Sequence, residues 1–188
     1  MEFNEVLKER KSIRSYEYKE ITKDEIKELI EFSNLAPSWK NSQTVRYHII
    51  LSDKMKESMQ KEGLAPFNAQ RTKEASVYIV ISFVKDISGF NEDKTPINEM
   101  GQGWGYYDAG IATNQLILKA CQMGYGSLIM GIRDAEAIRK MLQIPNEEII
   151  TSVVAIGKTK VIPERNKRKE IDEIIKIYYK ENCYETES

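Results

Sequence analysis

Residues 101–131 place the strongest constraint on the fold. This stretch opens with glycines on either side of Trp104, and residues 106–123 then contain no proline and a single glycine, Gly110. Apolar residues cover most of the circumference that a helix here would have: Ile111, Ala112, Leu116, Ile117, Leu118, Ala120, Cys121 and Met123. Because a helix that is apolar nearly all round is a buried one, the stretch predicts a buried central helix.

The residues after this helix predict its end and a short strand. Gly124 can adopt the left-handed conformation that commonly ends a helix. Residues 126–131 form a brief apolar run with a glycine at each end, which predicts a buried strand. The stretch therefore predicts a central helix that leads into a glycine-lined strand end. On its own, it fits equally well a core helix with no ligand nearby.

Three further runs predict strands. Residues 75–84 are rich in β-branched residues, as expected for a fully buried central strand. Residues 45–51 and 149–157 predict two others, which makes roughly four core strands with residues 126–131. Residues 85–100 are polar and contain Gly89 and Pro96, so they predict a surface excursion long enough to serve as a lid.

Helices are predicted between these strands. Thr22 and Glu25 form a capping box that opens a helix to about Leu35, and Asp134 caps another to about Leu142. Further helices are predicted over residues 3–9, 53–61 and 170–179, the last with Ile171, Ile174, Ile175 and Tyr178 on one face. Since no linker or repeat interrupts the pattern, we expect one α+β domain over residues 1–188.

Composition excludes several classes of function. The chain has 188 residues, 41% of them hydrophobic and 30% charged, with a formal net charge of −1. This balance gives no overall field toward nucleic acid or an anionic membrane. No apolar run approaches the roughly 20 residues of a membrane helix, and the first residues lack the pattern of a signal peptide. We therefore expect a cytoplasmic protein that binds neither nucleic acid nor membrane.

The residues that usually carry catalysis are scarce. Cys121 and Cys183 form neither a metal motif nor a disulfide framework, and Cys121 reads as a small buried hydrophobic residue. His48 is the single histidine, and we expect its hydrogen bonds to be satisfied within the sheet. Asp108 is expected to be structural, for example as a cap of the central helix. An enzyme with this sequence would leave the difficult chemistry to a cofactor.

Two polar stretches are candidates for ligand binding. Residues 10–14 (Arg-Lys-Ser-Ile-Arg) combine three cations with a hydroxyl, which fits an anion cradle or an ordinary solvated basic turn. Residues 158–169 are also strongly basic, and two such clusters can meet around one phosphate. The loop 37–43 is rich in small hydroxyls and amides, which fits a solvated turn or a holder of a ligand's polar edge.

Four stretches, in this order, resemble motifs of the flavin-dependent nitroreductase family over most of the chain. The first is residues 10–14, and the second is the loop 37–43 with Arg46-Tyr47 after it. The third is residues 108–116 together with the glycine-flanked stretch 124–131, and the fourth is Arg168 with the segment that follows it. The chain departs from the family where Gln43-Thr44-Val45 replaces the usual Gln-Pro-Trp, and where Asn166 stands at an often basic position.

The resemblance implies an α/β/α sandwich with a mostly antiparallel central sheet and an interlocked homodimer, in which the partner's C-terminal segment wraps across. It also implies FMN in a crevice at the dimer interface. The residues implied to hold FMN are Arg10, Lys11, Ser12 and Arg168 around the phosphate and ribityl chain, Arg14, Asn68 and Arg71 at the ring system, Ser127 and Leu128 through their backbone, and Pro37, Ser38 and Asn41 from the other subunit.

The resemblance also implies an activity without a catalytic side chain or a metal. Two electrons would pass from NAD(P)H through flavin N5 to an electron-poor acceptor such as a nitroaromatic or a quinone, in a ping-pong sequence. A guanidinium near the reduced flavin would stabilise its negative charge. Two alternatives stay open: a family variant that does not use nicotinamide, of a dehalogenase or dehydrogenase type, and an FMN-binding protein without turnover.

Overall fold

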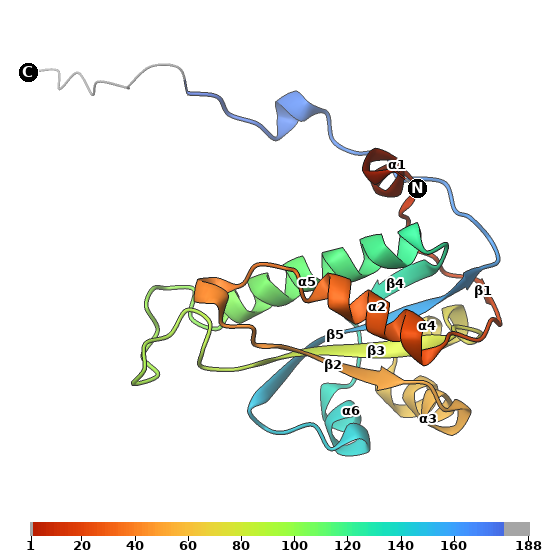
Figure 1. Cartoon of the computed structure of the whole chain (residues 1–188), viewed down its shortest axis with the longest axis horizontal. Coiled ribbons are helices and arrows are strands. Elements are labelled where there is room, and N and C mark those ends of the chain that lie inside the picture. The colour runs from red at the N-terminus through yellow and green to blue at the C-terminus, as the bar shows by residue number, and fades with distance from the viewer. Residues whose placement is uncertain (1, 179–188) are drawn as a thin grey trace, which may run out of the picture.

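The computed structural model describes residues 2–178 and shows a five-stranded sheet with helices on both faces (Figure 1). The helices are α1 (Phe3–Glu9), α2 (Lys23–Ser33), α3 (Asp53–Ser58), α4 (Pro66–Arg71), α5 (Gly103–Gln122) and α6 (Ala135–Leu142). The strands are β1 (Tyr16–Glu17), β2 (Val45–Ile50), β3 (Val77–Val84), β4 (Gly126–Met130) and β5 (Glu148–Thr159). Short turns of helix lie at Trp39–Asn41, Met59–Gly63 and Ile171–Glu173.

The strand ladders are antiparallel. β3 pairs with β2 on one side and with β5 on the other, and β5 also pairs with β4 and, at its end, with β1. The side chains of β3 from Val77 to Phe83 are buried, which confirms the prediction of a fully buried central strand. The predicted α+β class with a mostly antiparallel sheet is confirmed.

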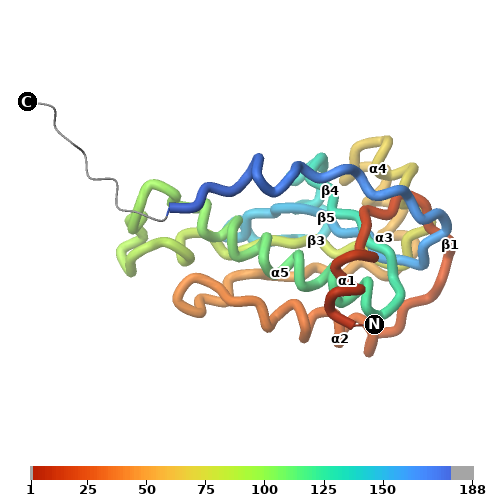
Figure 2. Tube along the Cα trace, turned by 90° about the horizontal axis from the view of Figure 1, so that it is seen from above, coloured from red at the N-terminus to blue at the C-terminus, as the bar shows by residue number. Residues whose placement is uncertain are grey.

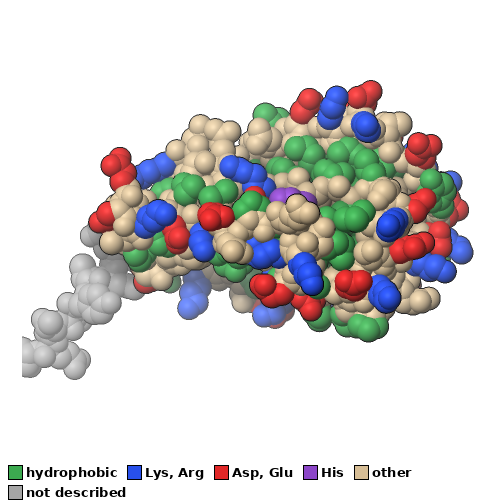
Figure 3. Space-filling view, turned by 90° about the horizontal axis from the view of Figure 1, so that it is seen from below, with side chains coloured by type: hydrophobic (Ala, Val, Ile, Leu, Met, Phe, Trp, Pro, Cys, Tyr) green, Lys and Arg blue, Asp and Glu red, His purple; other side chains and the backbone are tan. Residues whose placement is uncertain are grey.

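Helices cover both faces of this sheet, as the sandwich prediction requires. α2 and α5 pack on one face, where Leu29 and Leu116 join Ile79 and Ile81 in one apolar cluster. On the other face, Met59 and Ile138 pack against residues that include Val80. Figure 1 shows α2 and α5 above the sheet and α3 and α6 below it. Figure 3 looks onto the lower side, where acidic and basic side chains are interspersed.

The central helix α5 starts at Gly103, three residues earlier than predicted, and Gly124 follows its end with φ = +82°, as expected. Its inner side reaches the sheet closely, because a Cβ on Gly105 would overlap the ring of Phe83. Its outer side is exposed in this chain at residues that include Tyr106 and Tyr107. The eight apolar residues on which the prediction rests are all buried or partly buried. The prediction of a buried central helix therefore holds for its apolar residues, while Tyr106 and Tyr107 remain open in the single chain.

Three elements differ from the sequence prediction. The two-residue strand β1 and the one-and-a-half-turn helix α4 were not predicted, because segments this short carry no readable periodicity. The helix predicted over residues 170–179 is wrong for its described part, where a short turn at Ile171–Glu173 is followed by irregular chain. Short helices are unstable without a packed apolar face, and Ile171 and Ile174 are exposed. Residue 179 lies outside the described residues, as does Cys183.

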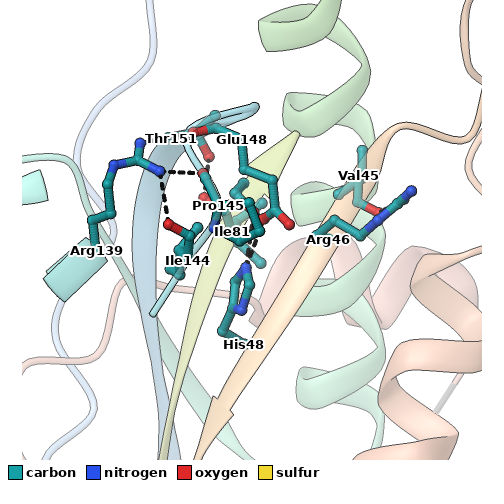
Figure 4. Close-up of polar contacts among 10 residues, drawn as sticks. Val45, Arg46, His48, Ile81, Arg139, Ile144, Pro145, Glu148 and Thr151 are labelled. Atoms are coloured by element: carbon teal, nitrogen blue, oxygen red, sulfur yellow. Dashed lines mark hydrogen bonds and ion pairs between the residues drawn. The ribbon is translucent and has the colours of Figure 1, made fainter. Parts of the chain in front are cut away.

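The Nε2 atom of His48 makes its hydrogen bonds within the sheet, as predicted. This atom lies 2.8 Å from Glu148 Oε2 and 3.0 Å from Ser82 Oγ. Figure 4 shows His48 on β2 pointing toward Glu148 at the start of β5. Arg139 of α6 donates hydrogen bonds to Ile144 O, just before that strand, and to Glu148 O, at its first residue. This polar cluster fixes the end of the sheet.

Candidate functional site

Residues from both ends of the chain line one cavity of about 190 Å³, which we call the basic pocket. Its lining residues are Arg10, Lys11, Ser12, Arg14, Pro163, Glu164, Arg165, Asn166 and Arg168. This lining holds five cations and one carboxylate. Two basic clusters that are far apart in the sequence therefore meet around one space, and the sum of their charges favours an anion there.

The N-terminal wall of the pocket is an extended segment that begins where α1 ends. The Ile13 N–H donates a hydrogen bond to Ser127 O at 2.9 Å, and Ser12 and Ser127 form a parallel bridge. Side chains alternate along an extended chain, so burial of Ile13 turns its neighbours Ser12 and Arg14 away from the core. The segment thus presents its polar side chains beside the start of β4.

The C-terminal wall is the chain that leaves β5. The Lys160 N–H donates to Ser15 O at 3.0 Å. This hydrogen bond holds the start of the C-terminal wall beside the N-terminal segment. The segment then passes α1 and runs on toward the C-terminus (Figures 1 and 2). Arg165 donates hydrogen bonds to backbone carbonyls at the end of α1.

Strand β4 lies directly behind the N-terminal wall. Ser127 and Leu128 are buried at its start. A Cβ on Gly126 would collide with the side chains of Ile13 and Thr159, so glycine is needed where the N-terminal segment crosses the strand. A second cavity of about 200 Å³ is lined by Ser127 and shares Arg10 and Lys11 with the basic pocket. Ser127 is therefore placed next to the basic pocket, while Leu128 lines neither cavity.

Asn68 and Arg71 on α4 do not line the basic pocket. Asn68 is buried, and its Nδ2 donates to the carbonyl of Ile132, just beyond β4, at 3.3 Å. The guanidinium carbon of Arg71 lies 5.1 Å from the centre of the Phe67 ring. Asn68 therefore lies beyond the far end of β4, so any ligand that it shares with the pocket must extend along that strand.

The loop 37–43 lies at the opposite end of α5. Pro37 and Ser38 line a separate small cavity with Asp108, whereas the basic pocket's neighbouring cavity includes Cys121. At a rise of about 1.5 Å per residue, Asp108 and Cys121 are about 20 Å apart along the helix. Within one chain, the structure does not bring Pro37, Ser38 and Asn41 to the basic pocket.

The backbone of this loop is strained. Lys40, Asn41 and Gln43 have positive φ angles of 46°, 57° and 49°, which cost a non-glycine residue free energy. The Ser38 Oγ accepts a hydrogen bond from the Gln43 N–H at 3.0 Å. Strain of this kind persists only when surrounding contacts hold it, and it is concentrated at functional sites.

Asp108 supplies those contacts and is not a helix cap. It is buried in the second turn of α5. Both of its carboxylate oxygens lie 3.1 Å from the backbone nitrogen of Trp39. The Ser88 hydroxyl donates to Asp108 Oδ2 at 2.7 Å and also contacts Ser42 Oγ at 2.8 Å. The predicted structural role is correct, but the capping role is wrong because the helix starts five residues earlier.

The structural role of Asp108 could be expected from the sequence, but its contact with the strained loop could not. Arg165, which ties the C-terminal wall to α1, was not predicted. Only the basic character of residues 158–169 could have pointed to Arg165, and it does not single that residue out.

Cys121 is half-buried, whereas the sequence predicted a buried residue. Partial burial raises the pKa of its thiol, and the nearby Glu9 carboxylate raises it further.

The basic pocket fits the phosphate end of a flavin mononucleotide. A phosphate dianion needs several cationic donors, and five surround this space. The cavity of about 190 Å³ is smaller than the roughly 300–1,000 Å³ of pockets that hold a whole ligand. The remainder of the cofactor would have to lie against surfaces outside the pocket.

Residues 2–178 contain no group of three or more His, Cys, Asp or Glu side chains placed to hold a metal ion. Over the same residues, no helix combines the length and the apolar character needed to cross a membrane.

Comparison with known proteins extends the resemblance. A protein of Archaeoglobus fulgidus, provisionally named an NADH dehydrogenase/NAD(P)H nitroreductase, is 29% identical over 152 residues, which cover 79% of this chain and 80% of that protein. A nitroreductase family protein of Clostridium novyi has a similar structure, with a TM-score of 0.75 and 27% identity over 88% of this chain and 89% of that one.

Further solved structures share the fold. A nitroreductase family protein of Streptococcus pneumoniae has a TM-score of 0.81 and 22% identity, covering 94% of this chain and 100% of that one. An Exiguobacterium sibiricum protein, provisionally named a nitroreductase and solved in complex with FMN, has a TM-score of 0.79 and 22% identity, covering 95% and 98%. The sequence model of the Nitroreductase family matches residues 7–158. The chain therefore belongs to the nitroreductase family.

Proposed function

We propose that the protein is an FMN-dependent oxidoreductase that uses NAD(P)H. The observation that carries the proposal is the meeting of residues 10–14 with Arg168 around one cavity. Bound FMN would supply two-electron transfer from NAD(P)H to an electron-poor acceptor such as a nitroaromatic or a quinone. The family membership and the FMN in the Exiguobacterium sibiricum relative support this cofactor.

Each part of the site has a proposed task. Arg10, Lys11, Ser12 and Arg168 hold the phosphate and ribityl chain, because they supply charged and hydroxyl donors in one cavity. Arg14 is exposed at the edge of the same cavity, from which its guanidinium can favour negative charge on the pyrimidine edge of the ring system. Ser127 and Leu128 approach the cofactor with backbone groups, and Asn68 and Arg71 bind it at the far end of β4.

The remaining proposed contacts require a second copy of the chain. Pro37 and Ser38 line a cavity with Asp108, which is about 20 Å along α5 from Cys121 in the cavity next to the basic pocket. We therefore propose that Pro37, Ser38 and Asn41 reach the FMN of the partner in a homodimer. The exposed apolar side chains of the C-terminal segment support this assembly. Ile162, Ile174 and Tyr178 are 61–76% exposed, and a run of such residues is typical of a surface that another chain covers.

A kinetic experiment distinguishes the proposed activity from its alternatives. The FMN-loaded protein is mixed anaerobically with NADH or with NADPH, and the flavin absorbance is followed before and after addition of a quinone. Rapid bleaching by one nicotinamide, followed by recovery on addition of the quinone, is expected. Absence of bleaching with both nicotinamides would contradict the proposal and favour a variant that does not use nicotinamide or an FMN-binding protein without turnover.

A further inference from the structure

We propose that Arg165 is a positioning residue that holds the C-terminal wall of the basic pocket in place, so that Arg168 faces the phosphate of FMN. The inference rests on the proposed function, since it concerns how the chain builds the phosphate site. Arg165 reaches back across more than 150 residues of sequence to the end of α1, where the N-terminal wall of the pocket begins.

The contacts of Arg165 are suited to this task. Its Nη2 lies 3.2 Å from Leu7 O and 3.1 Å from Arg10 O, and it also donates to Lys8 O. The last carbonyls of a helix have no partner within the helix and carry partial negative charge. A guanidinium is always charged and presents several donors in a fixed plane. Arg165 therefore donates hydrogen bonds to carbonyls at the C-terminal end of α1. The same contacts hold the C-terminal segment against that helix.

Little else holds this segment to the body of the chain. Among the hydrogen bonds and ion pairs found within residues 2–178, those of Arg165 alone join residues 161–178 to the rest of the structure. The pairing between Lys167 and Glu170 is local to the segment. The apolar side chains of this segment are mostly exposed, so packing within the chain does not replace the anchor.

The anchor lies close enough to control Arg168. Three residues span at most about 10 Å of extended chain, and Arg165 and Arg168 line the same cavity. When Arg165 is bound to the end of α1, Arg168 is confined near Arg10 and Lys11. When it is released, the segment after Thr159 can move away and take Arg168 with it. Arg165 thus lowers the entropy cost of gathering the cations around the phosphate.

The test compares FMN with riboflavin, which lacks the phosphate, in fluorescence titrations of the full chain. The variants are Arg165→Gln, Arg168→Gln and the double variant, and Lys176→Gln is the matched control. Lys176 is an exposed cation of the same segment, so its variant has the same loss of charge without the anchor. Limited proteolysis within residues 160–170 reports release of the segment.

Arg165→Gln should weaken FMN binding about tenfold, because FMN binding must then also confine the released segment that carries Arg168. Riboflavin binding by this variant, and FMN binding by Lys176→Gln, should stay within about twofold of wild type. Because Arg165 acts through Arg168, the double variant should bind FMN no more than about twofold worse than Arg168→Gln alone. Arg165→Gln should also be cleaved faster within residues 160–170.

Three results would overturn this role. If Arg165→Gln binds FMN like wild type, Arg165 does not position Arg168. If the variant loses FMN and riboflavin binding equally, the loss does not depend on the phosphate and the role is also wrong. Losses from Arg165→Gln and Arg168→Gln that multiply in the double variant would show that Arg165 contacts the phosphate directly. Wild-type protein that ignores both flavins would instead remove the proposed function, and the role of Arg165 with it.

Discussion

The buried carboxylate of Asp108 holds the backbone nitrogen of Trp39, with 3.1 Å to each of its two oxygens. Trp39 starts the turn that contains Lys40 and Asn41, both with positive φ. The same carboxylate accepts a hydrogen bond from Ser88 in the 85–100 excursion. One acidic side chain of α5 therefore fixes two loops, and the excursion is tied down at its base rather than free to swing as a whole.

Asp108→Asn should destabilise the fold by about 2–3 kcal/mol, because it removes a buried charged acceptor and places an amide N–H₂ on the side of either Ser88 or Trp39, where the carboxylate accepted a hydrogen bond. Chemical denaturation of wild type and variant measures the difference. Glu57→Gln is the matched control, since Glu57 is exposed and its neutralisation should change the free energy of unfolding by less than about 0.5 kcal/mol. A loss below 1 kcal/mol for Asp108→Asn would contradict the anchoring role.

Gly105→Ala should destabilise the chain by about 1–3 kcal/mol, because the added Cβ would overlap the ring of Phe83. Phe83→Leu makes room at that point while itself removing packing. The double variant should therefore be more stable than the sum of the two single losses predicts, by about 1 kcal/mol or more. Simple additivity in thermal or denaturant unfolding would show that the close approach of α5 to β3 is not what requires glycine.

Glu25 should contribute a pH-dependent part of the stability. The Thr22 N–H and, next, the Tyr125 hydroxyl donate to its carboxylate and lower its pKa from the ordinary value of 4.5. A lowered pKa in the folded state means that this contribution is complete above pH 4.5 and is lost as pH falls through the lower folded value.

The variant that isolates this effect is Glu25→Gln, because glutamine can still complete the capping box with Thr22. Wild type should be more stable than Glu25→Gln at pH 7, and the difference should shrink as the pH is lowered below 4.5. Denaturant titrations at a series of pH values measure it. A difference that stays constant, or grows, on acidification would show that the charge of Glu25 does not matter.

Complementation between two defective chains tests the shared site. Arg168→Gln removes a phosphate contact, and Asn41→Gly removes a side chain from the loop at the other end of α5 while tolerating its φ of 57°. Each variant alone should bind FMN less tightly. Co-expressed with different tags, they should form mixed dimers in which one of the two sites has both residues intact.

The purified mixed dimer should bind one FMN with nearly wild-type affinity, and the homodimer of each variant serves as its control. The second site of the mixed dimer carries both defects and should bind weakly. If the mixed dimer shows no site of wild-type affinity, the phosphate-binding residues and the loop 37–43 do not act on one cofactor from different subunits.

Much of the fold could be predicted because long elements carry periodic patterns. The β-branched run of β3, the capping box of α2 and the glycine after α5 each point to one local structure, and each is found as predicted. The two-residue strand β1 could not be predicted, since it exists because β5 extends to Thr159 and offers it a partner. The pattern of Ile171, Ile174 and Ile175 suggested a helix, but all three side chains are exposed in the described part of the chain, residues 2–178.

The site could be predicted only in part, for a related reason. The basic character of residues 10–14 and the arginine at 168 are visible in the sequence, and the structure adds that they line one cavity. The role of Asp108 depends on where α5 begins, which the pattern placed three residues too late. The contact of Arg165 with α1 depends on tertiary placement across the whole chain, which no local pattern records.

The visible absorption spectrum of freshly purified protein, followed by denaturation and identification of any released chromophore, tests the central claim most directly. The account predicts a flavin spectrum, with FMN as the released species, because five cations line one cavity and a phosphate needs several cationic donors. A colourless protein that also fails to bind added FMN would contradict the account and leave the basic pocket without its proposed ligand.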